Sequence, residues 1–457
     1  MGWQARFITS ILLLLCGSVC TAQPAATADL LERLDATEAG LEILETQFGP
    51  SDPRLAETLE QLADRYIALL QFDAAHAVLD RATQISRLAD GLFTPQQLPL
   101  LQKKIANYAN RGDWSNANTH AEHLLWLYRG KTPLSDDLVG QLLGLAHLHL
   151  RGVVEDALQQ QSYHFRQALE SNRLALLVAN AVWGEQDSRV VAVIYQLLKQ
   201  HHLQSVAIER GGQTGYALRE MAPGTRWVYD KDAMRRVHYF AGMGLLQQMR
   251  AVFSAQAVPD REAVAMVDLY LADWQVLFTR KEDALANYLY AYQGLLEAGV
   301  ASELVNRFLA VPEVLPIAEF FGSIETALAA RTNGRHTAAA NATQGNSLTL
   351  QFAEWSHSFP NVQAPAGVAP MVGEEADFAL FSFYLSGLNE VSRWISGSFR
   401  KGIGVAERIE ILELQTGSPD PEAGFFNKLH SLRFRPSMQD GMPTATSGTI
   451  RYIVANY

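Results

Sequence analysis

Apolar residues recur at helical spacing from residue 28 to about residue 330. The clearest stretch has apolar or small residues at Leu59, Leu62, Ala63, Tyr66, Ala75, Leu79 and Ala82. They fall at i, i+3 and i+7 in the first half and at i, i+4 and i+7 in the second, so each half places one apolar stripe on a helix. We therefore predict two antiparallel helices that approach each other closely at Ala63 and Ala75.

The pattern of this helix pair returns twice along the chain. Tyr108 lies 42 positions after Tyr66, and Ala117 lies the same distance after Ala75. The third copy consists of Leu271, Ala272, Gln275, Ala284, Tyr288 and Ala291. Recurrence at a fixed period is the sequence signature of a helical repeat. We expect these residues to form the repeat core, with Tyr66 and Tyr108 at equivalent buried positions.

This spacing resembles that of the tetratricopeptide repeat, and the preceding Gly49-Pro50-x-Asp52-Pro53 resembles its kinesin-light-chain form. The resemblance implies an α-solenoid, whose stacked helix pairs bury a continuous core and leave a concave surface for peptides or proteins. The pattern between residues 130 and 260 is helical but matches no repeat closely. An ordinary irregular helical domain is the alternative.

The composition changes after residue 330. Residues 331–346 are rich in Thr, Asn, Ala and Gly, and residues 361–375 in Pro, Gly and Ala, with a short apolar segment between them. We therefore expect a linker over residues 331–376. Beyond it, the spacing predicts a small α/β domain over residues 377–457. Its expected strands are 378–385, 408–414 and 449–454, and its expected helix is 420–432.

The end of the chain carries Leu432-x-Phe434-x-Pro436, then Asp440-Gly441-x-Pro443 and a closing strand. We expect Phe434 to be buried between helix and sheet, Pro436 to end strand pairing, and Asp440-Gly441 to turn the chain. The motif resembles the C-terminal domain of TonB, the bacterial energy transducer; an unrelated α/β module is the alternative.

The TonB resemblance implies an exposed sheet edge that can pair with an extended peptide. We place this partner-binding edge in the closing strand, at Thr449, Ile450, Arg451, Tyr452 and Ile453. The alternative is an edge that the helical part covers or that the charge of Arg451 blunts, which would leave the domain purely structural.

The first residues have the order of a secretory signal peptide. Arg6 precedes an apolar run from residue 8 to residue 19, and small Thr21-Ala22 follow. The run is too short to cross a bilayer of ~30 Å, which needs ~20 apolar residues. We expect a signal peptide over residues 1–22, a mature chain from Gln23 without a membrane span, and a periplasmic or secreted location. A retained anchor or a lipidated Cys16 or Cys20 is the alternative.

The charge and the candidate chemical motifs exclude several classes of function. A formal net charge of −11 argues against nucleic acid, since phosphate binding needs a basic stripe. The histidines at 120, 123, 147, 149, 201 and 202 form no His-Glu-x-x-His motif, and zinc needs three or four convergent ligands. Glycines 211, 212 and 215, and glycines 402 and 404, lack the context of a phosphate loop. We expect no metal and no cofactor.

The sequence thus predicts a mainly α protein in which a helical-repeat domain, residues 23–330, precedes the linker and the α/β domain. We interpret it as a non-enzymatic scaffold of the bacterial cell envelope that binds protein or peptide partners. Two alternatives stay open. One is a periplasmic hydrolase whose site is dispersed in sequence, and the other is a TonB-type transducer component with a membrane-anchored N-terminus.

Overall fold

A computed structural model describes residues 23–91, 94, 97–220, 230–332, 348–356, 358–359, 361–365, 368, 377–387, 403–415 and 422–454. The expected signal peptide, residues 1–22, lies outside the described residues. The chain divides into two compact units, residues 1–133 (unit 1) and residues 134–457 (unit 2), and each is described by itself. The fold is mainly α with a small α/β part, as the sequence predicts.

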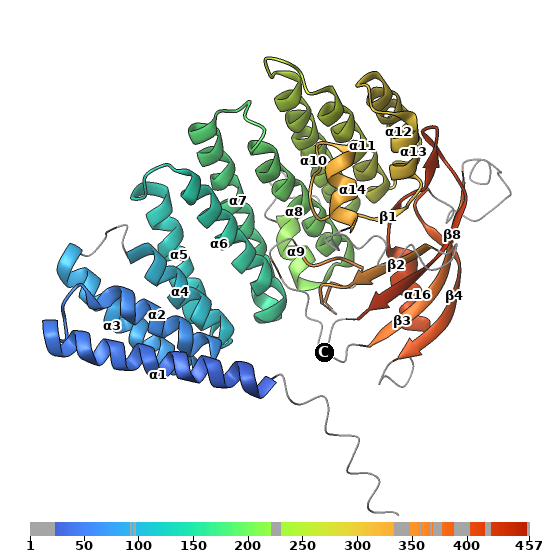
Figure 1. Ribbon diagram of the computed structural model, residues 1–457. Coiled ribbons are helices and arrows are strands. Elements are labelled where there is room, and N and C mark those ends of the chain that lie inside the picture. Colours follow the sequence, from blue (N-terminus) through green and yellow to red (C-terminus); the bar gives the residue numbers. More distant parts are fainter. Residues whose placement is uncertain are drawn as a thin grey trace, which may run out of the picture. The chain divides into compact units, whose positions relative to one another are not determined.

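Unit 1 consists of five helices, as far as it is described (Figure 1). They are α1 (Gln23–Phe48), α2 (Leu55–Ala68), α3 (Phe72–Asp90), α4 (Leu98–Asn110) and α5 (Trp114–Gly130). α2 packs on α3 and α4 packs on α5, in the two pairs that the spacing predicts. Leu59, Ala63 and Leu79 belong to the core cluster that α1 closes on one side through Leu34 and Leu41.

The helix pairs α2–α3 and α4–α5 share one tight turn with the later pair α11 (Arg261–Leu277) and α12 (Lys281–Glu297). In each turn one amide donates to the carbonyl five residues back, and the preceding amide donates three residues back. The bonds that span five residues run from Gln71 to Tyr66, from Asp113 to Tyr108 and from Arg280 to Gln275. The bonds that span three residues run from Leu70 to Ile67, from Gly112 to Ala109 and from Thr279 to Val276. This is a Schellman ending. The three copies predicted from the sequence therefore match in their turns.

Unit 2 begins with a helical layer that ends near residue 332 (Figure 1). Besides α11 and α12 it contains α6 (Asp136–Glu155), η2 (Leu158–Gln160), α7 (Gln161–Trp183), α8 (Val190–Arg210), α9 (Gly212–Glu220), α10 (Lys231–Ser254), α13 (Ser302–Leu309) and α14 (Ile324–Thr332). α11 is buried at almost every position, because α10 packs on one side and α12 on the other.

The α/β part of unit 2 is built on a four-stranded sheet with the order β2-β8-β3-β4. Its strands are β2 (Leu348–Ala353), β3 (Phe378–Leu385), β4 (Ala406–Gln415) and β8 (Thr446–Ile453). β3 alternates between buried and half-buried side chains, which fits a strand with one face on a core. Helix α16 (Glu422–Ser431) contacts β4, and its Leu429 lies in the same core as Phe381 and Ile450. The strands predicted at 378–385 and 408–414 and the helix at 420–432 are confirmed.

Two expectations about this sheet are wrong. The closing strand β8 is not at an edge, because it pairs in parallel with β2 on one side and antiparallel with β3 on the other. The reason is β2 itself. Residues 348–353 lie in the expected linker 331–376, yet they form a strand that covers the outer side of β8. In the described sheet the outer strands are therefore β2 and β4.

The α/β part is also not set apart from the helices of unit 2. β1 (Glu313–Val314), between α13 and α14, pairs with β5 (Phe434–Arg435). After β2, Trp355, Phe359 and Val362 pack among the helical residues Val153 and Phe165. The domain border expected after residue 330 therefore separates segments that share a core, and the division into compact units falls at residue 133 instead.

Candidate functional site

The expected repeat-core residues lie inside the helix pairs, with two exceptions. Leu59, Ala63, Ala75, Leu79, Ala82, Ala117 and Ala284 are fully buried, and Leu62 is 3% exposed. Tyr66 and Tyr108 are only half-buried, contrary to expectation. Each lies near the C-terminal end of its helix.

The two tyrosines face the preceding helix in both pairs, but they meet different partners there. The Tyr66 hydroxyl donates to the Glu38 carboxylate on α1, and this bond raises the pKa of Tyr66 to about 12. The Tyr108 ring lies 4.2 Å from the ring of His76 on α3 and 5.3 Å from that of His120 on α5. The position in the repeat is thus equivalent, while the chemistry is not.

Ion pairs join α2 and α4, which are the first helices of the two pairs in unit 1. The Lys103 ammonium on α4 lies 2.9 Å from the Glu60 carboxylate and 2.7 Å from the Asp64 carboxylate, both on α2. Exposed side chains continue along both helices at Glu57, Gln61, Asp64, Ala106 and Asn110. We call these five residues and Lys103 the first-helix surface. Lys103 connects the two helices that carry it.

The residues expected to form a partner-binding edge are paired inside the sheet. Thr449, Ile450, Arg451, Tyr452 and Ile453 each lie between a residue of β2 and a residue of β3. Ile450 and Tyr452 are fully buried, and the Tyr452 hydroxyl donates to the buried Glu354 carboxylate at 2.9 Å. The Arg451 guanidinium lies over the Phe378 ring. These residues hold the sheet together and offer no free edge.

The residues of the C-terminal motif close the α/β part onto the helices. Phe434 is fully buried and stacks on Phe383 with ring centroids 5.5 Å apart. Pro436 and Pro443 are buried beside the short hairpin of β6 (Met438–Gln439) and β7 (Met442–Pro443). Both turn residues, Asp440 and Gly441, have positive φ, which a two-residue hairpin turn of this type requires.

The turn of this hairpin docks on helices. The Asp440 carboxylate accepts from the Tyr292 hydroxyl on α12 and from the Asn306 amide on α13, both at 3.1 Å. A side chain at Gly441 would place its Cβ 2.9 Å from Tyr292, so only glycine fits this approach.

A buried cluster of charges links β5 to the helices of unit 2. The Arg435 Nη2 atom lies 2.5 Å from Asp273 on α11, and its Nη1 atom lies 2.7 Å from Glu313 on β1. Arg331 reaches the other oxygen of Glu313 at 2.7 Å, and the Tyr288 hydroxyl donates to Asp273 at 2.8 Å. The cluster thus joins two guanidinium groups and two carboxylates, whose charges balance.

The charged state of this cluster follows from its geometry. Burial alone would lower the pKa of Arg435, but the carboxylates of Asp273 and Glu313 raise it above its ordinary value. Sequence reasoning missed these residues because Arg435 and Asp273 are far apart in the chain. The available signal was the presence of two aspartates, Asp268 and Asp273, in the largely apolar run of α11.

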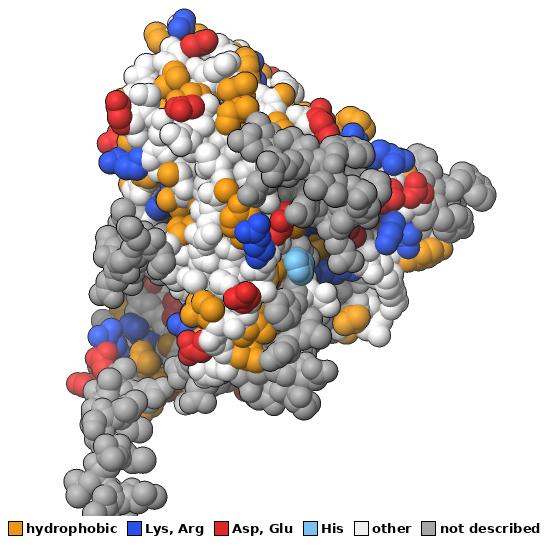
Figure 2. Space-filling view, turned by 90° about the vertical axis from the view of Figure 1, so that its right-hand side faces the viewer, with side chains coloured by type: hydrophobic (Ala, Val, Ile, Leu, Met, Phe, Trp, Pro, Cys, Tyr) orange, Lys and Arg blue, Asp and Glu red, His pale blue; other side chains and the backbone are white. Residues whose placement is uncertain are grey.

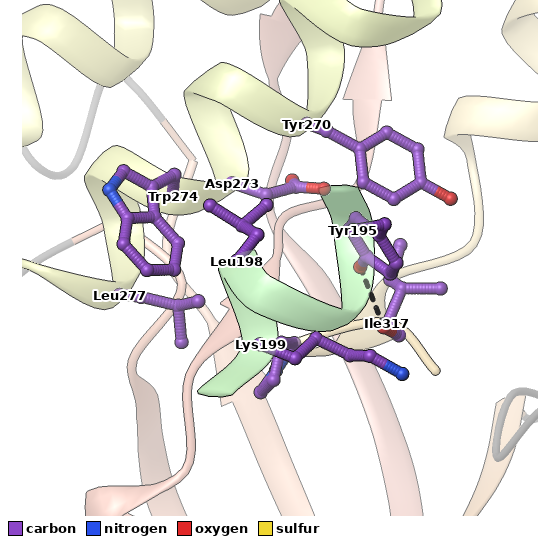
Figure 3. Close-up of a pocket in the computed structure, with 9 residues that line it drawn as sticks. Tyr195, Leu198, Lys199, Tyr270, Asp273, Trp274, Leu277 and Ile317 are labelled. Carbon is purple, nitrogen blue, oxygen red and sulfur yellow. Dashed lines mark hydrogen bonds between the residues drawn. The ribbon is translucent and has the colours of Figure 1, made fainter. Parts of the chain in front are cut away.

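A small cavity lies beside this cluster (Figure 3). Tyr195, Lys199, Tyr270, Asp273 and Trp274 line it, and its free volume is about 10 Å³. The Tyr195 hydroxyl donates to the Ile317 carbonyl, drawn as a dashed line in Figure 3, and the Lys199 ammonium donates to the Ala318 carbonyl at 2.5 Å. The space holds about one water molecule.

Lys199 is the residue of this cavity that most resembles a catalytic group. Burial lowers its pKa to about 8, which would favour a neutral, nucleophilic amine. Its amine is nevertheless already bonded to a carbonyl, and the cavity leaves no room for a substrate. We therefore assign Lys199 and the cavity to the packing between α8 and the segment after β1.

Histidines pair with each other at two places in unit 2. The His149 and His164 Nδ1 atoms lie 3.1 Å apart, and His164 Nε2 lies 2.9 Å from Asp156. The His201 and His238 Nδ1 atoms lie 3.0 Å apart. His202 points elsewhere, toward Trp274 and Phe278, so the adjacent histidines diverge. No group of three or more metal-ligating side chains occurs among the described residues.

On the face in Figure 2, basic and acidic side chains of the described residues are interspersed with hydrophobic ones. No described helix combines the length and the apolar character needed to span a membrane.

No protein family matches this chain, and no curated protein matches it. Among solved structures, the chain is similar to BtubC (BKLC) from P. vanneervenii, with 14% sequence identity and a TM-score of 0.34. The similarity covers 60% of this chain and 93% of BtubC.

Proposed function

We propose that this protein is a non-enzymatic scaffold that binds a partner protein through the first-helix surface of unit 1. The observation that carries the proposal is the ion pairing of Lys103 on α4 with Glu60 and Asp64 on α2, which joins the first helices of two consecutive helix pairs. Stacked helix pairs of this kind leave an extended surface along their first helices, and such surfaces commonly bind peptides or proteins.

A matched pair of arginine substitutions tests this surface. Ala106 on α4 is exposed within the first-helix surface, and Ala77 is exposed on α3, outside it. Ala106→Arg adds a bulky charge to the proposed surface, whereas Ala77→Arg adds the same group to a second helix. Affinity capture from envelope extracts should recover a partner with the wild-type chain from Gln23 and with Ala77→Arg, but not with Ala106→Arg. Equal capture by both variants would contradict the proposal.

We further propose that the protein works in the bacterial cell envelope, as the charged, apolar and small residues at positions 6–22 suggest. N-terminal sequencing of the protein from fractionated cells should give a chain that begins near Gln23. A chain that keeps residues 1–22 in the membrane fraction would contradict this location. That result would favour the TonB-type transducer component, whose likeness is limited to the motif at residues 432–443.

A further inference from the structure

A second cavity, open to solvent, lies at the turn between α11 and α12. It measures about 360 Å³ and lies among Asp232, Arg235, Arg236, Tyr239, Phe278, Thr279 and Arg280. We call it the arginine pocket. Its size falls within the range of small-ligand sites, and three guanidinium groups face one carboxylate in its lining. Such an excess of positive charge stands out in a chain whose formal net charge is −11.

Two aromatic rings hold the arginines of this pocket in place. The Arg235 guanidinium lies 5.8 Å from the Phe278 ring centroid, and the Arg280 guanidinium lies 5.3 Å from the Tyr239 ring centroid. A guanidinium on an aromatic face keeps its N–H groups directed outward in the ring plane. The rings therefore restrict the positions of Arg235 and Arg280.

The acidic neighbours neutralise these arginines only in part. Arg235 lies 3.5 Å from Glu209 and Arg236 lies 3.8 Å from Asp230, both longer than a charge-assisted hydrogen bond. The buried Nε atom of Arg235 has no hydrogen-bond partner within the described part of the chain.

A further cation, Arg433, interacts electrostatically with Arg235. Arg433 donates to the carbonyls at the end of α16. Burial lowers its pKa, Glu209 raises it, and Arg235 lowers it again, so the two guanidinium groups repel each other. An anion in the pocket would relieve this repulsion.

The surface next to the pocket is apolar. On α10, Val237 is 43% exposed and Phe240 is 63% exposed, and Phe240 lies one helical turn after Arg236. A free anion such as phosphate would leave this apolar strip unused. A polypeptide with acidic and apolar side chains would cover both.

We propose that the arginine pocket binds carboxylate side chains of an acidic segment in a partner protein, while Val237 and Phe240 contact apolar side chains of the same segment. This inference rests on the proposed scaffold function but uses a different surface, in unit 2. Carboxylates suit the site because an arginine donates two parallel N–H groups to both carboxylate oxygens.

The test uses a fluorescein-labelled pentapeptide of alternating glutamate and phenylalanine, with the chain from Gln23 at low ionic strength. Fluorescence anisotropy should show binding that weakens about tenfold or more in Arg236→Gln and in Arg280→Gln, since each loses a charged hydrogen bond. Arg280→Lys should bind with intermediate affinity, because it keeps the charge and loses the planar donors.

Arg261→Gln is the matched control. It removes an exposed arginine at the opposite end of α11, roughly 24 Å from the pocket at 1.5 Å per residue, and should leave binding unchanged. Circular dichroism melting should show that each variant folds as the wild type does.

Four results would overturn the proposal. They are no peptide binding by the wild type, equal binding of a peptide with glutamine in place of glutamate, equal binding by all variants, and binding of inorganic phosphate without binding of the acidic peptide. The last result would leave a small-anion site in place of a partner site. These outcomes are independent of the capture experiment with Ala106→Arg, so the two proposals fail separately.

Discussion

Arg435 donates to carboxylates on two other elements, and its side chain is only 1% exposed. A buried ion pair adds little net stability compared with apolar residues of the same size, but removal of one partner leaves the other charge buried and unpaired. The cluster therefore specifies how β5 meets α11 and β1 more than it strengthens the fold.

Replacement of Arg435 should destabilise unit 2 strongly. In Arg435→Met, Asp273 and Glu313 lose their shared cation, which should lower the free energy of unfolding by about 3–5 kcal/mol. Urea denaturation followed by tryptophan fluorescence measures the change. Arg307→Met, at an exposed position on α13, is the control and should change stability by less than about 0.5 kcal/mol. Similar denaturation midpoints for the two variants would show that the cluster has no such role.

The buried histidines make stability depend on pH. Burial, with smaller effects from Arg235 and Arg433, lowers the pKa of His202 to about 3. The unfolded chain has an ordinary histidine pKa of about 6.5, so it binds a proton that the folded chain does not bind. The contribution of neutral His202 to the free energy of unfolding is fully present above about pH 6.5 and is lost as the pH falls toward 3.

His202→Phe should therefore reduce this pH dependence. As the pH falls from 7 to 5, one such histidine should lower the free energy of unfolding by about 2 kcal/mol. The free energy of unfolding of the variant should therefore fall by about 2 kcal/mol less than that of the wild type over the same range. Urea denaturation at several pH values measures it. His430→Phe, at an exposed histidine, should follow the wild-type profile. If the free energy of unfolding of His202→Phe changed with pH as that of the wild type does, His202 would not be a source of the pH dependence.

At the scale of elements, the repeated turn requires a left-handed residue that the sequence does not always supply. The central residue has a φ of 58° at Leu70, 79° at Gly112 and 60° at Thr279. Only the second of these is a glycine, which adopts this conformation without the strain that a Cβ brings.

Leu70→Gly should therefore stabilise unit 1 by about 1 kcal/mol, because it removes the strain of a Cβ at positive φ. Leu70 is 73% exposed, so little apolar burial is lost. The control is Leu88→Gly, at a 71% exposed position within α3, which should destabilise by about 1 kcal/mol. Thermal unfolding by circular dichroism separates the two. A lower melting temperature for Leu70→Gly would contradict the role of the turn.

The sequence predicts the positions of helices and strands better than it predicts which distant segments they pack against or pair with. Helical spacing located the pairs around Ala75 and Ala117, because the contacts that define a helix pair are local. The position of β8 was predicted wrongly, since its partner β2 lies about a hundred residues earlier within a stretch of linker-like composition. Arg435 was missed for the same reason. Its partners are distant in sequence, and no local pattern marks a pairing of that kind.

At the scale of the whole molecule, the two compact units have separate cores. Leu59 and Leu79 belong to a cluster within unit 1, whereas Phe434 and Ile450 belong to one within unit 2. A change in one core should therefore leave the other core intact.

Ala75→Leu tests this independence. The larger side chain overpacks α2 against α3 and should destabilise unit 1 by about 1–3 kcal/mol. Hydrogen exchange read by mass spectrometry should show faster exchange in peptides from residues 23–133 and unchanged exchange in peptides from residues 134–457. Ala77→Leu, at an exposed position on the same helix, should change neither. Faster exchange throughout the chain after Ala75→Leu would show that the units unfold together.

The central position of β8 has a consequence for biogenesis. Of the four strands in the sheet, β8 is synthesised last, yet β2 and β3 both pair with it and not with each other. While the ribosome still holds this segment, β2 has no neighbour and the β3–β4 hairpin lacks its inner partner. Helix pairs with local contacts can form during that time. Nascent chains arrested before residue 446 should therefore carry folded helices and an unfinished sheet whose apolar face chaperones recognise.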